Sequence, residues 1–421
     1  MRKPGCLMAI VLYAIAGYAR QVAAQVDQQR AQEYFKEAQA LCERDGGRMW
    51  GVSLCAPMVI FDRRTQTIAT SRPAPEGAPP QLLGLVNAPL EWGGVTWGAY
   101  VWDFVINRSP LRRNELLLHE LFHGVQGKLG LMQPFLASEH LDAVDGRYWL
   151  RLEWRALARA LRESGDNRRV AVQDALAFRQ ARRRIYPSGV EPERGQEITE
   201  GLAAYTATVL VADSSSDAIA SALDLLVTAE SGESFVRMFA YTSGPAYGVL
   251  LDAVSPGWHR RVRGTDDLAT LLATALAVQP VADAAAAASR YGGGELRGHE
   301  EERDQRRMER IAELRRRFVD GPVLLIRGGG SGSSDSRGAV VIPGEGTVYF
   351  GSYRATVVSG SLEAEKGVLV ASDGSSRRVP APVLRDEVTV SGDGWTFKAS
   401  PGWVVREGAR RGDYEVVRRP P

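Results

Sequence analysis

The stretch His119-Glu120-Leu121-Phe122-His123 decides how this chain is interpreted. An α-helix has 3.6 residues per turn, so histidines four positions apart project from one face and can bind one metal ion. Glu120 is then about 100° round the helix from His119, beside that metal position. The opposite face is apolar, so we expect both imidazoles to face a cleft. The residues of the apolar face are Leu111, Leu117, Leu118, Leu121, Phe122 and Val125.

Both ends of this predicted helix are marked in the sequence. Ser109 can cap the start with Pro110 in the first turn, and Gly127 with Gly130 can end it. A helix that carries two unrelated surface histidines is the alternative. Because the caps and the apolar face agree with the histidine spacing, we favour a metal site and predict zinc as its metal.

Composition limits the classes of partner. The 421 residues are enough for two or three domains, and 44% hydrophobic with 24% charged residues is ordinary for a globular protein. The 52 basic and 50 acidic residues nearly cancel, which leaves a formal net charge of +2. This balance gives no reason to expect nucleic acid or a membrane surface as a partner.

The first residues resemble an export signal. Arg2 and Lys3 precede an apolar run over 6–19, and Val22-Ala23-Ala24 suits cleavage after Ala24. The run is short for a membrane span, although an uncleaved anchor is the alternative. We therefore predict a secreted or periplasmic protein with no stable membrane span after cleavage.

Two cysteines, Cys42 and Cys55, would remain in the exported chain. Export to an oxidising compartment favours a disulfide between them, and two buried free thiols are the alternative. In either case two cysteines cannot supply a second metal cluster.

The residues before the histidine motif predict a helix followed by strands. A helix is expected over 28–43, and two apolar runs within 49–70 suggest a short hairpin around a turn at 62–64. The Pro-rich and Gly-rich segment 71–80 is predicted to be a loop. The aromatic residues of 91–107 lack helical spacing, which indicates strands that lead into the histidine helix.

The residues after the motif are mainly helical up to about residue 290, and the chain then changes character. Alternating charges over 300–317 predict a solvated helix. Beyond Asp320, short apolar runs separated by Gly and Ser predict a small all-β region, with a low-complexity loop over 327–338. The helices predicted before residue 290 cover 148–163, 168–184, 197–212, 218–229, 234–241 and 267–278.

A catalytic zinc needs three protein ligands and a water, so the motif requires a third ligand from elsewhere. A histidine six residues after His123 is excluded because Leu129 stands there. His140 follows a loop-like stretch and is interpreted as a surface histidine. The favoured ligand is Glu200, which we expect to open an apolar helix whose Gly and Ala residues pack closely against the His119 helix.

Glu153 competes with Glu200 for this role. It lies on an apolar stripe, where an ionised carboxylate needs a partner. It could bind the metal, support a ligand histidine or pair with an arginine such as Arg112. Glu197 is a less favoured candidate for the third ligand. The alternative interpretation is that Glu197 is a solvated acid in the first turn of a helix.

Together, the two motifs resemble a known class of enzymes. His119 to His123 and the segment Glu200-Gly201-Leu202-Ala203-Ala204-Tyr205 resemble the gluzincins, zinc peptidases with an HExxH helix and a glutamate ligand on a second helix. The resemblance implies His119, His123 and Glu200 as zinc ligands and Glu120 as general base in peptide hydrolysis. The chain has no Gly-x-Met-Glu-Asn segment of the aminopeptidase type, so an endopeptidase is expected.

The sequence does not identify the residue that would donate a hydrogen bond to the reacting carbonyl oxygen. Tyr205, Tyr241, Tyr247 and His259 are the candidates, and buried structural tyrosines are the alternative. The segment Tyr241 to Gly248 is predicted to be a tight turn near the end of a helix.

We predict an α+β fold: a mainly helical zincin-like domain preceded by a small antiparallel sheet, and a small all-β C-terminal domain. The predicted segments are a signal peptide over 1–24, the metallopeptidase domain over 25–290, a charged helical connector over 291–320 and the β-rich domain over 321–421. The predicted partner is a peptide or protein substrate. A catalytically idle binding protein, acting through its β-rich tail or its aromatic strands, is the alternative function.

Overall fold

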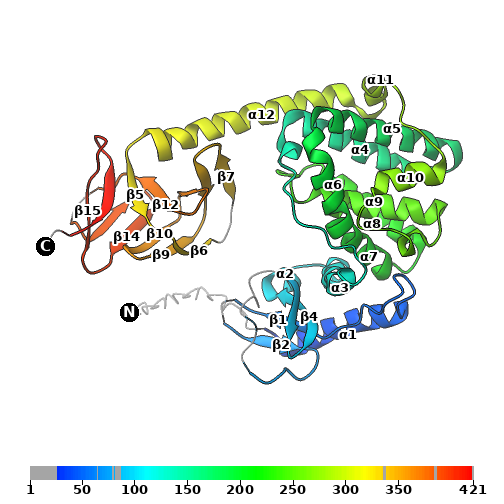
Figure 1. The fold of residues 1–421 in the computed structure, drawn as a ribbon, viewed down its shortest axis with the longest axis horizontal. Helices are drawn as coiled ribbons and strands as arrows, with labels where there is room; N and C mark the ends of the chain where they lie inside the picture. Colours follow the sequence, from blue (N-terminus) through cyan, green and yellow to red (C-terminus); the bar gives the residue numbers. More distant parts are fainter. Residues whose placement is uncertain are drawn as a thin grey trace, which may run out of the picture. The chain divides into compact units, whose positions relative to one another are not determined.

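A computed structural model describes residues 26–63, 65–77, 80, 87–334, 338–383 and 386–419 (Figure 1). The predicted signal peptide over 1–24 lies outside the described residues. The chain divides into two compact units, residues 1–297 and 298–421. The first has a helical body and a small N-terminal sheet, and the second carries sheets only after its first helix, which confirms the predicted α+β class.

The first unit begins with helix α1 (Gln28–Asp45) and a four-stranded sheet of order β2-β1-β4-β3. The sheet was predicted to be antiparallel, but it is mixed, because β1 and β4 pair in parallel. The chain leaves the edge strand β2 and enters β3 at the opposite edge, and the β3–β4 hairpin then brings β4 in beside β1. The strands are β1 (Met58–Phe61), β2 (Ile68–Thr70), β3 (Ala88–Trp92) and β4 (Val95–Val101).

Helix α1 is joined covalently to the segment that precedes β1, and by hydrogen bonds to strand β2. Cys42 and Cys55 form the disulfide that export favours, with their Cα atoms 5.4 Å apart. The side-chain amides of Gln28 and Gln32 donate to backbone carbonyls of the edge strand β2, each at 2.9 Å. These bonds satisfy carbonyl groups that an edge strand would otherwise present to solvent.

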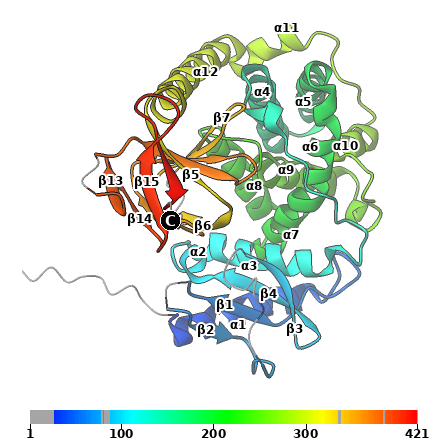
Figure 2. The ribbon, with the colours of Figure 1, turned by 60° about the vertical axis from the view of Figure 1, so that its left-hand side comes forward.

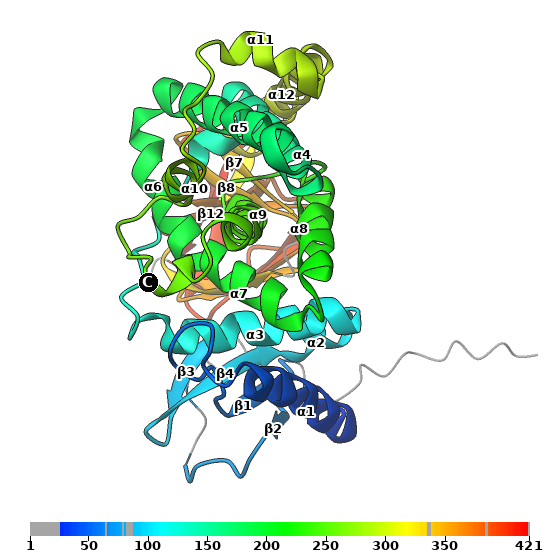
Figure 3. The same cartoon turned by 90° about the vertical axis from the view of Figure 1, so that its right-hand side faces the viewer.

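The strand region ends sooner than predicted. After β4, residues Trp102–Ile106 form the short helix α2, whose Trp102 and Val105 are buried. Helix α3 (Pro110–Gln126) follows, and Ser109 Oγ accepts a hydrogen bond from the Arg112 backbone N–H, as the predicted cap requires. Figures 2 and 3 show α3 lying between the sheet and helix α7 (Leu202–Val211).

The helical body surrounds helix α9 (Phe239–Val254), which is buried along most of its length. Figure 3 shows α9 almost end-on, and it contacts α4, α7, α8 and α10. A helix buried all round must be apolar or small on every face, as this one is. The other helices of the body are α4 (Val144–Arg162), α5 (Gly165–Ile185), α6 (Val190–Gln196), α8 (Ser215–Ala229), α10 (Leu268–Leu276) and α11 (Ala284–Ala288).

The prediction of a tight turn at Ser243-Gly244-Pro245-Ala246 is wrong, because this segment lies inside α9. Proline and glycine favour turns locally, but burial of the whole helix overrides that preference here. Gly244 has a packing role: a Cβ added to it would lie 2.3 Å from the Cα of Gly201. Its lack of a side chain therefore lets α9 approach the chain segment that carries Glu200.

Helix α12 (Gly293–Arg315) covers most of the predicted charged connector, and a π-helical turn, Arg316–Asp320, continues it. The division between the two units falls within α12, after Arg297. None of the described helices is both long enough and apolar enough to cross a membrane.

In its described residues the second unit has one five-stranded sheet, β13-β14-β10-β9-β6, and one seven-stranded sheet, β15-β16-β5-β12-β11-β8-β7. Buried and exposed residues alternate along β9, β10 and β14, so one face of the first sheet is in the core. Part of the predicted 327–338 loop is strand β6. The strands are β5 (Val323–Arg327), β6 (Gly330–Ser334), β7 (Ala339–Ile342), β8 (Gly346–Tyr349), β9 (Tyr353–Val357), β10 (Gly360–Ala364), β11 (Val368–Ala371), β12 (Ser376–Pro380), β13 (Thr389–Gly392), β14 (Trp395–Ala399), β15 (Trp403–Glu407) and β16 (Tyr414–Arg418).

Candidate metal centre

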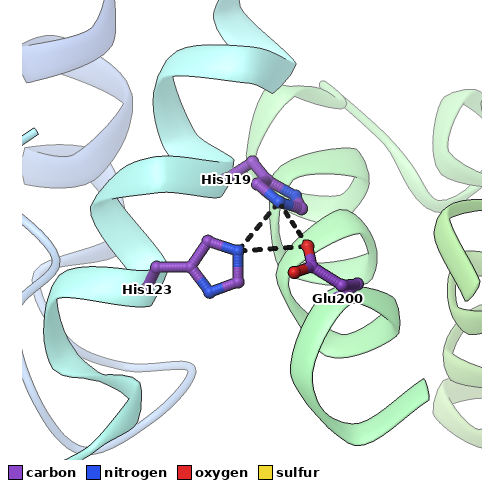
Figure 4. Close-up of side chains that lie close together, drawn as sticks. All are labelled: His119, His123 and Glu200. Atoms are coloured by element: carbon purple, nitrogen blue, oxygen red, sulfur yellow. Dashed lines mark hydrogen bonds and ion pairs between the residues drawn. The ribbon is translucent and has the colours of Figure 1, made fainter. Parts of the chain in front are cut away.

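Helix α3 presents both histidines of the motif on one face. Leu117, Leu118, Leu121 and Phe122 of the same helix are almost completely buried. Their packing fixes the rotation of α3 about its axis, and His119 and His123 point toward the helical segment that carries Glu200 (Figure 4). The three residues come from two segments that are far apart in the sequence.

Glu200 does not open a helix, contrary to the prediction. Helix α6 continues without a break into a π-helical turn, Glu197–Gly201, and then into α7. The Leu202 N–H donates to the Glu197 carbonyl, which is the i→i+5 pattern of a π-helix. The extra residue in this turn separates the directions of Glu197 and Glu200, and only Glu200 reaches the histidines. Single π turns of this kind are frequent at functional sites.

The segment of small residues after Glu200 makes the contact that was predicted and a second one that was not. Gly201 lies against α9, where an added Cβ would be 3.2 Å from both the Ala240 carbonyl oxygen and the Gly244 Cα. We expected the Gly and Ala residues to pack against the His119 helix. Helix α7 does pack against α3, as expected, and the close approach that Gly201 itself permits is to α9.

Three ligand atoms converge in this centre. Glu200 Oε2 is 3.2 Å from His119 Nε2 and 3.3 Å from His123 Nε2, and the two Nε2 atoms are 2.9 Å apart. Ligand atoms bound tetrahedrally at about 2.0–2.1 Å from a zinc ion would be about 3.3 Å apart. The group His119, His123 and Glu200 could therefore hold a metal ion.

The protonation of His123 strengthens this assignment. Its Nδ1 lies 2.7 Å from Oε1 of Gln126, an oxygen that can only accept, so Nδ1 carries the proton in the neutral ring. The His123 Nε2 lone pair then faces the carboxylate of Glu200. Acceptor atoms that converge in this way repel one another unless a cation lies between them.

Burial and neighbouring charges shift the pKa values of the three ligands in different directions. Burial lowers the pKa of His119. Burial acts in the same direction on His123, but hydrogen bonding and the charges of Glu200 and Glu120 outweigh it and raise its pKa. Burial alone would raise the pKa of Glu200, yet hydrogen bonds from His119 and His123, in the states in which these rings carry a proton on Nε2, hold it well below its ordinary value. Glu200 is thus ionised, as a metal-binding carboxylate must be.

Glu120 lies beside the ligands and is only 7% exposed. Burial raises the pKa of its carboxyl to about 7; the neighbouring His123 opposes this shift and the charge of Glu200 adds to it. A carboxyl with a pKa near neutrality can both accept and return a proton. Glu120, His119 and Tyr241 line one cavity of about 400 Å³.

Tyr241 is the one oxyanion candidate that the structure brings to the centre. Its ring stacks on His119, with the ring centroids 5.2 Å apart. Burial, together with the charge of Glu200 and a hydrogen bond to it, raises the pKa of Tyr241, so the phenol keeps its proton. The other three candidates lie elsewhere: Tyr205 donates to Asp252, Tyr247 donates to Glu153, and His259 lies with its Nδ1 3.9 Å from Asp252 Oδ1.

Glu153, the competing ligand, belongs to a buried ion network and not to the metal centre. It is fully buried and accepts hydrogen bonds from Arg179 Nε at 2.9 Å and Arg182 Nη1 at 2.7 Å. It does pair with arginines, although not with Arg112, which pairs with Glu115 and Asp224.

The other two alternative ligands are in the same network. Glu197 was interpreted as a solvated acid, but it is fully buried and accepts from Arg179 Nη1 at 2.8 Å. His140 was interpreted as a surface histidine, but its side chain is only 10% exposed and its Nε2 is bonded to the buried Glu193 at 2.7 Å. Arg182 also donates to Glu193, which links the acids into one group.

Sequence reasoning missed Gln126, which contacts both halves of the centre. It lies three residues after His123, a spacing that puts both on one helical face, and this was the available signal. The arginines that neutralise Glu153 and Glu197 were missed as well, because Arg179 and Arg182 reach them from another helix, α5.

None of the protein families, curated proteins or solved structures compared with this chain matches it.

Proposed function

We propose that this chain is an exported zinc peptidase of the gluzincin type. The observation that carries the proposal is Glu120 beside three converging ligand atoms, since a site that only stored a metal would need no base there. Two imidazoles and one carboxylate leave a position open on a tetrahedral zinc, which is the ligand set of catalytic and not of structural sites. The Cys42–Cys55 disulfide supports export, because disulfides persist in oxidising compartments.

Zinc in this site would supply a Lewis acid that polarises a substrate carbonyl and acidifies water. Glu120 accepts the proton of the attacking water and then donates it to the leaving amine. A shuttle must gain and lose its proton near the working pH; burial raises the pKa of Glu120 above that of an ordinary carboxyl, and a bound zinc would act in the opposite direction. The Tyr241 hydroxyl keeps its proton and is bonded to Glu200; it would donate to the developing oxyanion by turning away from that carboxylate.

A peptide or protein substrate fits the surroundings of Glu120. The cavity of about 400 Å³ has both apolar and charged walls, and Arg108, Arg112 and Glu115 line it besides Glu120. Asn87, directly before the edge strand β3, also lines this cavity. An extended peptide could add to β3 through backbone hydrogen bonds and reach Glu120. The apolar walls are formed by Leu116, Ala204, Ala207, Leu225 and Met238.

Hydrolysis by the purified, zinc-loaded protein tests this function. Casein and an unstructured peptide are the substrates, with Glu120→Gln as the inactive variant and the exposed Glu191→Gln as the matched control. We expect Glu120→Gln to keep its zinc and lose at least 100-fold in kcat/KM, since it retains the shape of the side chain but cannot accept a proton. Equal hydrolysis by Glu120→Gln and the wild type would refute the mechanism. A zinc-loaded wild type without hydrolysis would favour the idle binding protein.

A further inference from the structure

Gln126 is completely buried at the last position of α3, and every polar atom of its side chain has a partner. Its Nε2 donates to the backbone carbonyls of Ile198 at 3.0 Å and Thr199 at 2.8 Å. Both carbonyls belong to the π-helical turn that carries Glu200. On the other side, its Oε1 lies 2.7 Å from His123 Nδ1.

The orientation of this amide follows from its partners. Two backbone carbonyls can only accept, so the amide atom that faces them must be the NH₂ group. The oxygen is then the atom that faces His123, and it requires a proton on Nδ1. The Gln126 side chain therefore sets the tautomer of His123 and holds the π-helical turn that carries Glu200.

We infer that Gln126 is a positioning residue that joins His123 and Glu200 into one preorganised ligand set. The inference rests on the proposed function only in taking zinc as the bound ion. Without the amide, His123 could adopt the Nε2–H tautomer, which cannot bind a metal through Nε2. The carbonyls of Ile198 and Thr199 would also lose the donor that holds the π turn against α3.

Partners of this kind behind a metal-binding histidine are worth about 10- to 100-fold in metal affinity. The effect of Gln126 should be at the upper end of this range, because it contacts the segments of two ligands. The effect of Gln126 should also be specific to metal binding. A general loss of packing would lower the stability of the fold without this specific loss of metal affinity.

Gln196 provides a matched control in the same protein. It is a buried glutamine whose Nε2 also donates to a backbone carbonyl, that of Leu136 at 2.7 Å, and to Ser138 Oγ at 3.2 Å. It contacts neither histidine nor Glu200 through any hydrogen bond that the structure describes. Replacing either glutamine by methionine removes one buried amide of the same size.

The test compares Gln126→Met and Gln196→Met in the full chain by two measurements. Competition with a chelator gives the zinc dissociation constant, and nitrogen NMR of the metal-free protein gives the tautomer of His123. We expect Gln126→Met to weaken zinc binding by 10- to 100-fold and to lose the pure Nδ1–H tautomer. Gln196→Met should change the zinc affinity by less than about 3-fold and keep the tautomer, with a similar fall in melting temperature for both variants.

Equal zinc affinity in Gln126→Met and the wild type would overturn the inference, as would equal losses in both variants. A wild-type His123 in the Nε2–H tautomer would also overturn it. The result is independent of hydrolysis: a protein that binds zinc but cleaves nothing would refute the proposed function and leave this inference standing on affinity and tautomer.

Discussion

Glu197 and Glu200 stand three residues apart in one π-helical turn, yet they belong to opposite kinds of site. Glu197 is fully buried and saturated by the guanidinium of Arg179. Glu200 meets two imidazoles, one of which presents a lone pair fixed by Gln126. The comparison shows that burial of a carboxylate alone does not indicate a metal site. The groups around the carboxylate are more informative: one surrounded by arginines is already neutralised, whereas one that faces two imidazoles could share a metal ion with them.

We expect the largest effect on the free energy of unfolding from a change in the arginines of the buried ion network. Arg182→Met removes a fully buried cation that donates to both Glu153 and Glu193. Breaking a buried ion pair in this way leaves uncompensated charge and should lower the free energy of unfolding by about 3–5 kcal/mol.

Chemical denaturation of the metal-free protein measures this loss. The exposed Arg306→Met on α12 is the control and should change the free energy of unfolding by less than about 0.5 kcal/mol. A loss below 1 kcal/mol for Arg182→Met would mean that the network is not a stabilising core of the protein.

A second effect should separate the two glutamates directly. Zinc at about 1,000 times its dissociation constant should stabilise the wild type by about 4 kcal/mol, because it binds only the folded state. Glu197→Gln should start from a lower melting temperature and keep this zinc-induced rise, whereas Glu200→Gln should lose most of it. Thermal melts with and without zinc measure both, and the same rise in the two variants would contradict the assignment of Glu200.

The smallest effect should be the loss of folding stability at acid pH. Burial alone would raise the pKa of Glu193, but Arg182 and the other groups bonded to it hold that pKa well below the ordinary 4.5. A carboxyl whose folded pKa is depressed stabilises the fold above its unfolded pKa, and this stability is lost as the pH falls below about 4.5.

Each pKa unit of this depression is worth about 1.4 kcal/mol. Denaturation of metal-free protein between pH 6 and 3 should therefore show a falling free energy of unfolding, and Glu193→Gln should flatten the slope. An unchanged slope in Glu193→Gln would assign the acid sensitivity to other carboxyl groups.

Much of this architecture follows from local sequence. The Ser109 cap, the histidine spacing and the apolar residues of α3 specify a helix with two imidazoles on one face, and the structure has that helix. The α+β class also agrees with the sequence-based expectation, and the disulfide between Cys42 and Cys55 decides between two alternatives that the sequence left open. These features depend on residues close together in the chain or on the chemistry of a single residue type.

The features that the sequence did not predict depend on contacts between distant segments. The π turn at Glu197–Gly201 has no local signature, because its extra residue is stabilised by Gln126 from α3 and by the approach of α9 at Gly244. Helix α9 continues through Pro245 because the helix is buried by contacts with distant segments, which the local sequence does not show. From the sequence Glu153 is a plausible ligand, but in the fold Arg179 and Arg182 of α5 neutralise it.

The central claim is that His119, His123 and Glu200 together hold one zinc ion. The most direct measurement is the metal content of the purified full chain by mass spectrometry, after dialysis against zinc and removal of loosely bound metal, for the wild type, Glu200→Ala and the exposed control Glu191→Ala. We predict one zinc per chain in the wild type and in Glu191→Ala, and less than about one tenth of that in Glu200→Ala. A fully zinc-loaded Glu200→Ala protein would contradict the account.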